Sequence, residues 1–250
     1  MSFYFSENSL LGIEKAIADG AVIILPVGQT EEHGRHLPVG TDAMIARKFG
    51  EGLGEALTGK LPVLVMDTIT YGYSQDGILE WPGCPNIRTR TICDYLFDIV
   101  DSLATMGFKK IVTLDCHGNH DFVHRLVMRE IVDKHNVYMM TLSPSKLTQE
   151  LYNKIKDDPQ GDIHGGEYET SCMLYINPDI VDVNEYTNVD AIRCNSILRG
   201  PVSTWGLQKS KSGLFGDPTT STAEKGKLLM EEAVKQGVKY IEEYYHHIFE

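Results

Sequence analysis

The chain has 250 residues, 42% hydrophobic and 23% charged, a composition typical of globular proteins that excludes the disordered, fibrous and collagenous classes. Asp and Glu outnumber Lys and Arg by 35 to 23, and the net charge of −12 argues against nucleic acid or an anionic membrane as a partner. The five cysteines are widely spaced, and no apolar stretch has membrane length. The first residues do not match the pattern of a targeting leader, so we expect one cytoplasmic domain over residues 1–250.

Short β-branched apolar runs alternate with longer stretches of helical periodicity, which predicts an α/β fold with a mainly parallel sheet flanked by helices. The predicted strands are, in chain order, 21–27, 61–67, 110–115 and 137–142. Apolar residues at helical spacing predict a helix over 89–106 that ends at Gly107. Residues 216–219 predict a turn, and the capping-box pattern of Ser221 and Glu224 predicts the start of the last long helix.

The segment GQTEEHGRHLPVGTDA follows the first predicted strand, where open α/β sheets bind ligands. In an extended chain Glu31 and His33 point to one side and Glu32 to the other. Carboxylate and imidazole suit Zn²⁺, Mn²⁺ or Fe²⁺, and the two oxygens of Asp42 could bridge two ions. The alternative is a solvated loop in which Thr41 or Asp42 only caps a helix. These residues alone favour neither interpretation.

Two further polar clusters follow later in the chain. LDCHGNHDF ends the third predicted strand and contains Asp115, His117, Asn119, His120 and Asp121. A parallel sheet would place this loop on the same rim as the first cluster. We expect structural roles for His120 and for His124, which lies in the helix that begins near Asp121.

The third cluster, GDIHGGEYETS, holds Asp162, His164, Glu167 and Glu169. The two glutamates could be a first-turn pair favoured by the helix dipole. That interpretation leaves the preceding histidine unexplained. His164 could instead serve as a general acid or base beside a metal-activated water.

The ordered set EEHGRHLPVGTD, DCHGNH, HGGEYETS and GDPTTSTAEKG resembles the creatininase family of metal-dependent amidohydrolases, in which these stretches recur in this order across the whole chain. The resemblance implies an α/β sandwich, a two-metal site and commonly a homohexamer. It implies that Asp42 bridges the ions, that His164 handles protons near the substrate, and that the metal ligands are Glu31, His33, Asp42, His117 and Glu169.

The sequence also departs from the family pattern. Creatinine-hydrolysing members resemble one another in a His-x-Glu step where this chain has His117 followed by Gly118 and Asn119, so one carboxylate is missing. Asn119-His120 replaces a Gly-Asn step, and Arg35 replaces a proline. Those members also share flap tryptophans that clamp a flat ring. This chain has only Trp81 and Trp205, and partial stacking would fall to Tyr138, Tyr152 and Tyr168.

We therefore expect a hydrolase with two divalent ions per chain, Zn²⁺ and/or Mn²⁺, with Fe²⁺ a further option. The expected substrate is a small cyclic amide, a formamide or a polyhydroxylated cyclic ketone, rather than creatinine. Glu167 would assist His164 in proton transfer. The candidates for substrate binding are Ser74, His36, Arg35 and Arg88. The alternatives are a metal-dependent aldolase or isomerase and a metal-stabilised binding module without activity.

Overall fold

The computed structural model describes residues 1–158, 162, 164–188 and 210–247. A four-stranded parallel sheet has the order β2-β1-β3-β4 and is built from β1 (Val22–Val27), β2 (Val63–Val65), β3 (Lys110–Asp115) and β4 (Tyr138–Leu142). All four predicted strands are confirmed, although β2 is shorter than predicted. The sheet is parallel throughout because each strand is reached through a crossover connection.

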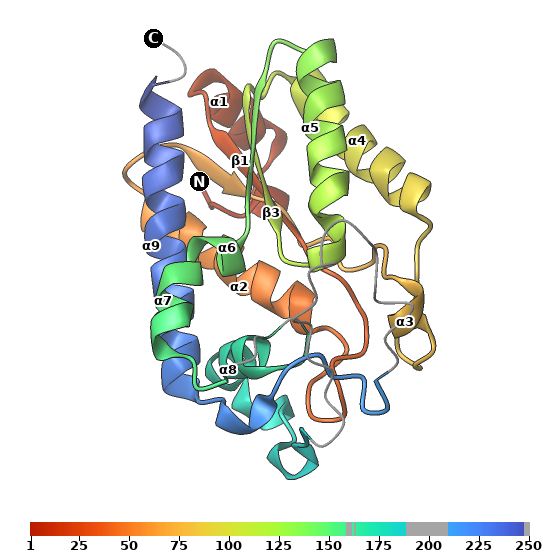
Figure 1. Ribbon diagram of the computed structural model, residues 1–250. Coiled ribbons are helices and arrows are strands. Elements are labelled where there is room, and N and C mark those ends of the chain that lie inside the picture. The colour runs from red at the N-terminus through yellow and green to blue at the C-terminus, as the bar shows by residue number, and fades with distance from the viewer. Residues whose placement is uncertain (159–161, 163, 189–209, 248–250) are drawn as a thin grey trace.

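Helices cover both faces of the sheet (Figure 1). They are α1 (Leu10–Ala18), α2 (Thr41–Leu57), α3 (Asp76–Leu79), α4 (Thr89–Met106), α5 (Asp121–Lys134), α6 (Pro144–Leu147), α7 (Gln149–Ile155), α8 (Glu167–Ile176) and α9 (Ala223–His247). Val22 and Ile24 of β1 pack in one core with α2, α8 and α9, while Ile23 and Leu25 pack in a second core with α1, α4 and α5. None of the helices in the described ranges is long and apolar enough to cross a membrane.

The ends of two helices test the sequence predictions. Helix α4 spans the predicted residues, and Gly107 ends it with a φ of 114° that favours glycine. The predicted capping residue of α9 is wrong by one position. The Lys225 amide donates to the Thr222 hydroxyl (3.1 Å), whereas the Ser221 hydroxyl donates to the Glu167 carbonyl oxygen (3.3 Å). Ser221 is therefore used in a tertiary contact with α8.

The carboxyl ends of β1 and β3 lie side by side, since Val27 pairs with Asp115 in the register. The loops that follow these two strands consequently share one rim of the sheet. Gly28, directly after β1, lies against the first turn of α2, where an added Cβ atom would meet the Ala43 backbone at 2.5 Å. The absence of a side chain at Gly28 thus lets Asp42, in that first turn, reach the rim.

Candidate metal centre

All five sequence-predicted ligands come together, from four segments of the chain. Glu31 and His33 lie in the loop after β1, Asp42 in the first turn of α2, His117 in the loop after β3, and Glu169 in the first turn of α8. The first four are at most 6% exposed, and the Glu169 side chain is 19% exposed. The polar cluster is thus almost entirely withdrawn from solvent.

Within the described residues, three groups of side chains have ligand atoms close enough to hold an ion, all within 4.8 Å of one another. The groups are Glu31–Asp42–His117, His33–Asp42–Glu169 and Glu31–His33–His164. Glu31, His33 and Asp42 each belong to two of them, and Asp42 is the one member shared by the two groups that exclude His164. Asp42 Oδ1 lies 3.2 Å from His33 Nε2, and its Oδ2 lies 2.9 Å from His117 Nδ1. The two oxygens of one carboxylate therefore face two histidines.

The Asp42 carboxylate fits a cation. Burial alone would raise its pKa, but the charge of His33 and the contact with His117 lower it, so the group is ionised. Oδ2 is buried, and its 2.9 Å contact with His117 Nδ1 balances its charge only while that nitrogen carries a proton. A buried anionic oxygen without a hydrogen bond is costly unless a positive charge balances it. The first turn of α2 also favours a negative charge at this position.

Hydrogen bonds to backbone carbonyl groups orient both histidines. His33 Nδ1 donates to the Glu31 carbonyl oxygen (3.1 Å), and His117 Nε2 donates to the Tyr73 carbonyl oxygen (3.1 Å). A carbonyl can only accept, so the free ligand atoms are His33 Nε2 and His117 Nδ1, the two that face Asp42.

The same two imidazoles carry protons when no ion is bound. Burial would lower the pKa of His117, but Glu31 and Asp42 raise it to about 9. The pKa of His33 is likewise raised well above its usual value, because Asp42 and Glu169 outweigh its burial. A metal ion would take the place of these protons in balancing the carboxylates.

A buried hydrogen-bond chain holds Glu31. The Ser74 hydroxyl donates to Glu31 Oε2 at 2.5 Å, and the Gln29 amide nitrogen donates to Ser74 Oγ at 2.6 Å. The other end of the Gln29 side chain accepts from the Gly72 amide (2.6 Å). Ser74, which we considered for substrate binding, is thus buried behind Glu31. Sequence reasoning missed Gln29, although its position directly after a buried strand was the available signal.

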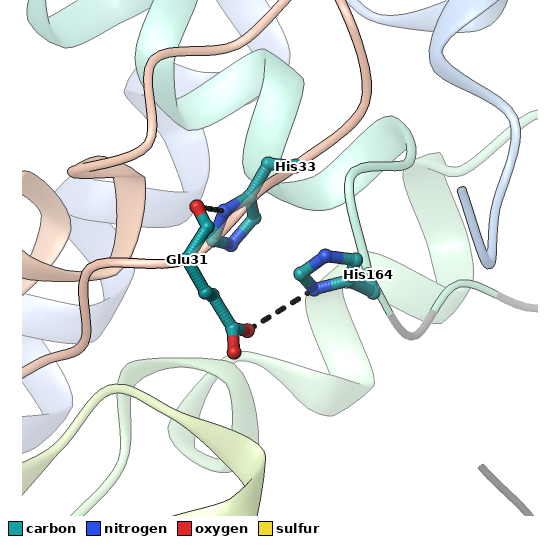
Figure 2. Close-up of side chains that lie close together, drawn as sticks. All are labelled: Glu31, His33 and His164. Carbon is teal, nitrogen blue, oxygen red and sulfur yellow. Dashed lines mark hydrogen bonds and ion pairs between the residues drawn. The ribbon is translucent and has the colours of Figure 1, made fainter. Parts of the chain in front are cut away.

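His164 lies beside this cluster in the loop that precedes α8 (Figure 2). Its Nε2 donates to the Glu32 carbonyl oxygen (2.5 Å), and its Nδ1 lies 3.4 Å from Glu31 Oε1. The His164 ring is 4.2 Å from the His33 ring. Burial and the charge of His33 lower the pKa of His164, yet the contact with Glu32 and the charge of Glu31 leave it raised overall.

Glu167, which we considered for proton transfer, is engaged elsewhere. Its carboxylate accepts from the backbone amides of Asp157 (3.0 Å) and Asp158 (2.9 Å), and from Lys225 Nζ (2.5 Å). The side chain is fully buried, and none of the three groups found among the described residues contains it. Glu167 therefore fastens the chain after α7 to the starts of α8 and α9.

The other histidines near the site are held in neutral form. His36 Nε2 lies 2.8 Å from the Thr170 hydroxyl, and burial together with the charge of His33 lowers the pKa of His36 to about 4. His120 Nε2 accepts from the Tyr73 amide (3.0 Å), and burial lowers the pKa of His120 well below its usual value. That nitrogen is therefore not available to an ion. Asn119 lies half-buried beside it in the 3-10 helix Gly118–His120.

The remaining candidates for substrate binding do not lie together in the structure. Arg35 and Arg88 are both exposed. A pocket of about 290 Å³ adjoins the cluster and is lined by His117 and Glu169, with Tyr152 and Tyr168. Tyr138 lies on β4, where its carbonyl oxygen accepts from Tyr244. Trp81 follows the short helix α3, and Trp205 lies outside the described residues.

The same pocket contains residues that sequence reasoning did not consider, namely Ser143, Ser145 and Lys146, which follow β4. Asp121 of the second polar cluster also lines it and begins α5. The signal that could have identified them is the one used for the first two clusters, namely their position after the carboxyl end of a strand.

Comparison with known proteins shows that the sequence is similar to creatininase-family proteins over most of its length. The profile of the creatininase family, described as creatinine amidohydrolase, matches residues 8–241. Creatinine amidohydrolase of Pseudomonas putida is 27% identical, with 95% of each chain covered. 3-Dehydro-scyllo-inosose hydrolase of Thermotoga maritima is 23% identical, with 99% of this chain and 84% of the relative covered. A mycofactocin precursor peptide peptidase of Mycobacterium ulcerans is 28% identical, with 88% and 84% covered.

Solved structures resemble the chain over nearly its whole length. A mutant creatininase of Zn-Zn type aligns with a TM-score of 0.85 at 25% identity, covering 98% of this chain and 99% of that one. A manganese form of creatininase aligns with a TM-score of 0.83 at 25% identity, covering 98% and 100%. The fold, including the strands that carry the polar cluster, is therefore shared.

Proposed function

The chain belongs to the creatininase family and is a hydrolase, and on that premise we propose that it hydrolyses a small polar cyclic substrate with two divalent ions. The observation that carries the proposal is the shared carboxylate of Asp42, whose two oxygens face His33 and His117 separately. A single carboxylate between two sets of ligands can hold two neighbouring ions, one through each oxygen.

We assign one ion to Glu31, Asp42 and His117, and the other to His33, Asp42 and Glu169. Carboxylate and imidazole ligands suit Zn²⁺ and Mn²⁺, and the zinc and manganese forms of similar structures support both metals. Fe²⁺ is a third option for the same ligands. When bound, such ions lower the pKa of a water molecule and polarise a carbonyl group.

The proposed reaction on an amide adds water across the carbon–nitrogen bond. The water oxygen forms a bond to the carbonyl carbon, the carbon–nitrogen bond breaks, and the leaving nitrogen takes a proton. We assign the proton transfer to His164, because its Nδ1 faces the cluster while its Nε2 is fixed by the Glu32 carbonyl group. Glu167 is not assigned a part, since its carboxylate is used by two backbone amides and Lys225.

The substrate is proposed to be a ring that carries polar groups rather than creatinine. Tyr152 and Tyr168 line the adjoining pocket, but their rings meet edge to face at 5.3 Å and do not form a parallel clamp for a flat ring. The curated relatives act on creatinine, on an inosose and on a precursor peptide, as their names state, so the family scaffold supports several substrates. A homohexamer of single-domain chains is the assembly we infer from the family resemblance.

Metal analysis and a substrate screen test the proposal together. Purified protein is stripped with a chelator and reloaded with Zn²⁺ or Mn²⁺, and the bound metal is measured. The same samples are assayed with lactams, formamides and keto-inositols. We expect two equivalents of metal per chain and hydrolysis that depends on them. Less than half an equivalent, with no activity gained on reloading, would refute the two-ion hydrolase.

A further inference from the structure

The pocket beside the metal centre extends away from the ligands toward a pair of oppositely charged side chains. His117 and Glu169 line it, and so do Asp121 from the start of α5 and Lys146 from α6. Any substrate that fills this pocket of about 290 Å³ while its carbonyl group lies at the metal centre would therefore contact this pair. The pair is 25 residues apart in sequence and is joined only by the fold.

Asp121 and Lys146 are close and open to a ligand. Lys146 Nζ lies 2.5 Å from Asp121 Oδ1, while Arg125 Nε donates to Asp121 Oδ2 at 2.7 Å. The hydrogen bond from Arg125 and the contact with Lys146 lower the pKa of Asp121, so the pair is ionised. The side chains of Lys146 and Asp121 are 61% and 39% exposed. An ion pair this exposed contributes little to stability, so its place in the pocket is not explained by folding.

A group that can only donate hydrogen bonds, next to a group that can only accept them, is complementary to two neighbouring hydroxyl groups. An ammonium group only donates and a carboxylate only accepts, whereas each hydroxyl does both. One hydroxyl of a vicinal pair can accept from Lys146 while the next donates to Asp121, and both bonds are strengthened by charge. Ser143, Ser145 and Gln149 line the same pocket and add neutral hydrogen-bond donors and acceptors.

The charges at the Asp121 and Lys146 end of the pocket argue against an anionic group bound there. Lys146 is the one Lys or Arg among the described residues that line it, and it is already paired with Asp121. Four carboxyl groups line it, and burial raises the pKa of Asp115 to about 6 and that of Asp162 to about 7, whereas the pKa of Asp121 is lowered by Arg125 and Lys146. A carboxylate or phosphate placed beside Lys146 would therefore lie close to Asp121 as well. A neutral group that donates and accepts meets no such repulsion.

We propose that Asp121 and Lys146 form the subsite that selects a neutral, polyhydroxylated substrate by binding two neighbouring hydroxyl groups. The proposal rests on the proposed function, because it takes the same pocket as the place where the substrate is bound. It narrows the substrate class from any small polar ring to one with adjacent hydroxyls.

The test compares three lactams on the metal-loaded protein: gluconolactam, which is neutral and polyhydroxylated, valerolactam, which has no hydroxyls, and pyroglutamate, which is anionic. Turnover is measured for each, and gluconolactam binding is measured separately by calorimetry. The variants are Lys146→Met and Asp121→Asn. Their matched controls are Lys154→Met, an exposed lysine of α7, and Asp133→Asn, an exposed aspartate of α5.

We expect the wild type to prefer gluconolactam. Each subsite variant should lower the ratio of kcat/KM for gluconolactam to that for valerolactam by about 10- to 100-fold, the scale of a lost charged hydrogen bond, mainly through KM. The controls should keep the ratio. Hydrolysis that proceeds with equal ratios in all proteins, a preference for pyroglutamate, or no binding of gluconolactam would overturn the subsite. Gluconolactam binding that is weakened by both variants, without turnover of any lactam, would support the subsite and count against the proposed hydrolysis.

Discussion

Asp42→Asn should remove both metal ions, because Asp42 is the one residue shared by both proposed ion sites. The substitution keeps the size of the side chain but replaces an anionic oxygen with a neutral amide. Two unit charges 4 Å apart interact by about 4 kcal/mol at an effective dielectric constant of 20. For each ion the loss of one unit of negative charge therefore weakens binding by at least roughly 10³-fold, and a divalent charge increases this figure.

Glu32→Gln is the matched control for this prediction. Glu32 is also a buried carboxylate of the same segment, and its Oε2 accepts from the Gly34 amide at 2.8 Å, a bond that the glutamine oxygen can replace. It belongs to none of the three metal-capable groups of described residues. Glu32→Gln should therefore retain two equivalents of metal, while Asp42→Asn should fall below half an equivalent after the same dialysis.

Elemental analysis measures the metal, and circular dichroism with thermal unfolding shows whether each variant is folded. The folded state has to be checked because the neutral amide of Asp42→Asn would leave protonated His33 and His117 without their nearest negative charge. Equal loss of metal from both folded variants would mean that Glu32 also faces the ions. The expectation that the side chains of Glu31 and Glu32 point to opposite sides of the chain would then be wrong. Retention of one full equivalent in Asp42→Asn would refute the bridging role.

Four further outcomes are expected. His164→Ala should keep both ions and lower kcat by roughly 10²- to 10⁴-fold, the scale of general acid–base catalysis, and metal loss would make His164 a ligand instead. Glu167→Gln should lower the free energy of unfolding by about 1–3 kcal/mol in denaturant titration while the metal stays bound, and full stability would contradict its anchoring role. Burial lowers the pKa of His124 to about 4, so below pH 6.5 the unfolded chain binds a proton that the folded chain does not. His124 alone should therefore contribute a fall in stability of roughly 3 kcal/mol as pH drops from 6.5 to 4, and the fall measured for His124→Gln should be smaller than that of the wild type by about this amount, whereas the exposed His246→Gln should leave it unchanged. Creatinine kcat/KM should stay below about 10⁴ M⁻¹s⁻¹, the lower range for natural substrates, in an assay of creatine formation.

The local elements of the fold could be predicted because their signals are local. The six residues of β1 are all buried, and such an apolar run is visible without any knowledge of its neighbours. The order β2-β1-β3-β4 could not be predicted, since strand pairing depends on contacts between distant segments. The error at the start of α9 has the same cause, because Ser221 was removed from its expected capping role by the carbonyl group of Glu167, 54 residues away.

The residues that form the polar cluster could also be named from the sequence, but not how their side chains are oriented. The clusters after β1 and β3 were visible in the sequence, and the parallel sheet brings their loops to one rim. The orientation of His117 depends on the backbone carbonyl of Tyr73, 44 residues away, and that of Glu31 depends on Ser74. Every residue has a backbone carbonyl group, so no sequence pattern identifies the one that orients His117.

Helical geometry sends the side chains of Glu167 and Glu169, which are neighbours in one sequence motif, in different directions. They are two residues apart in the first turn of α8, which separates their side chains by about 200° around the helix, so only one can face the cluster. Glu169 Oε2 lies 3.7 Å from His33 Nε2, whereas Glu167 points to the amides of Asp157 and Asp158. Their spacing in the chain determines the angle between them but not the rotation of α8 against the sheet. That rotation brings Glu169 to the cluster and removes Glu167 from it, which is why we propose His164, and not Glu167, as the side chain that carries the proton.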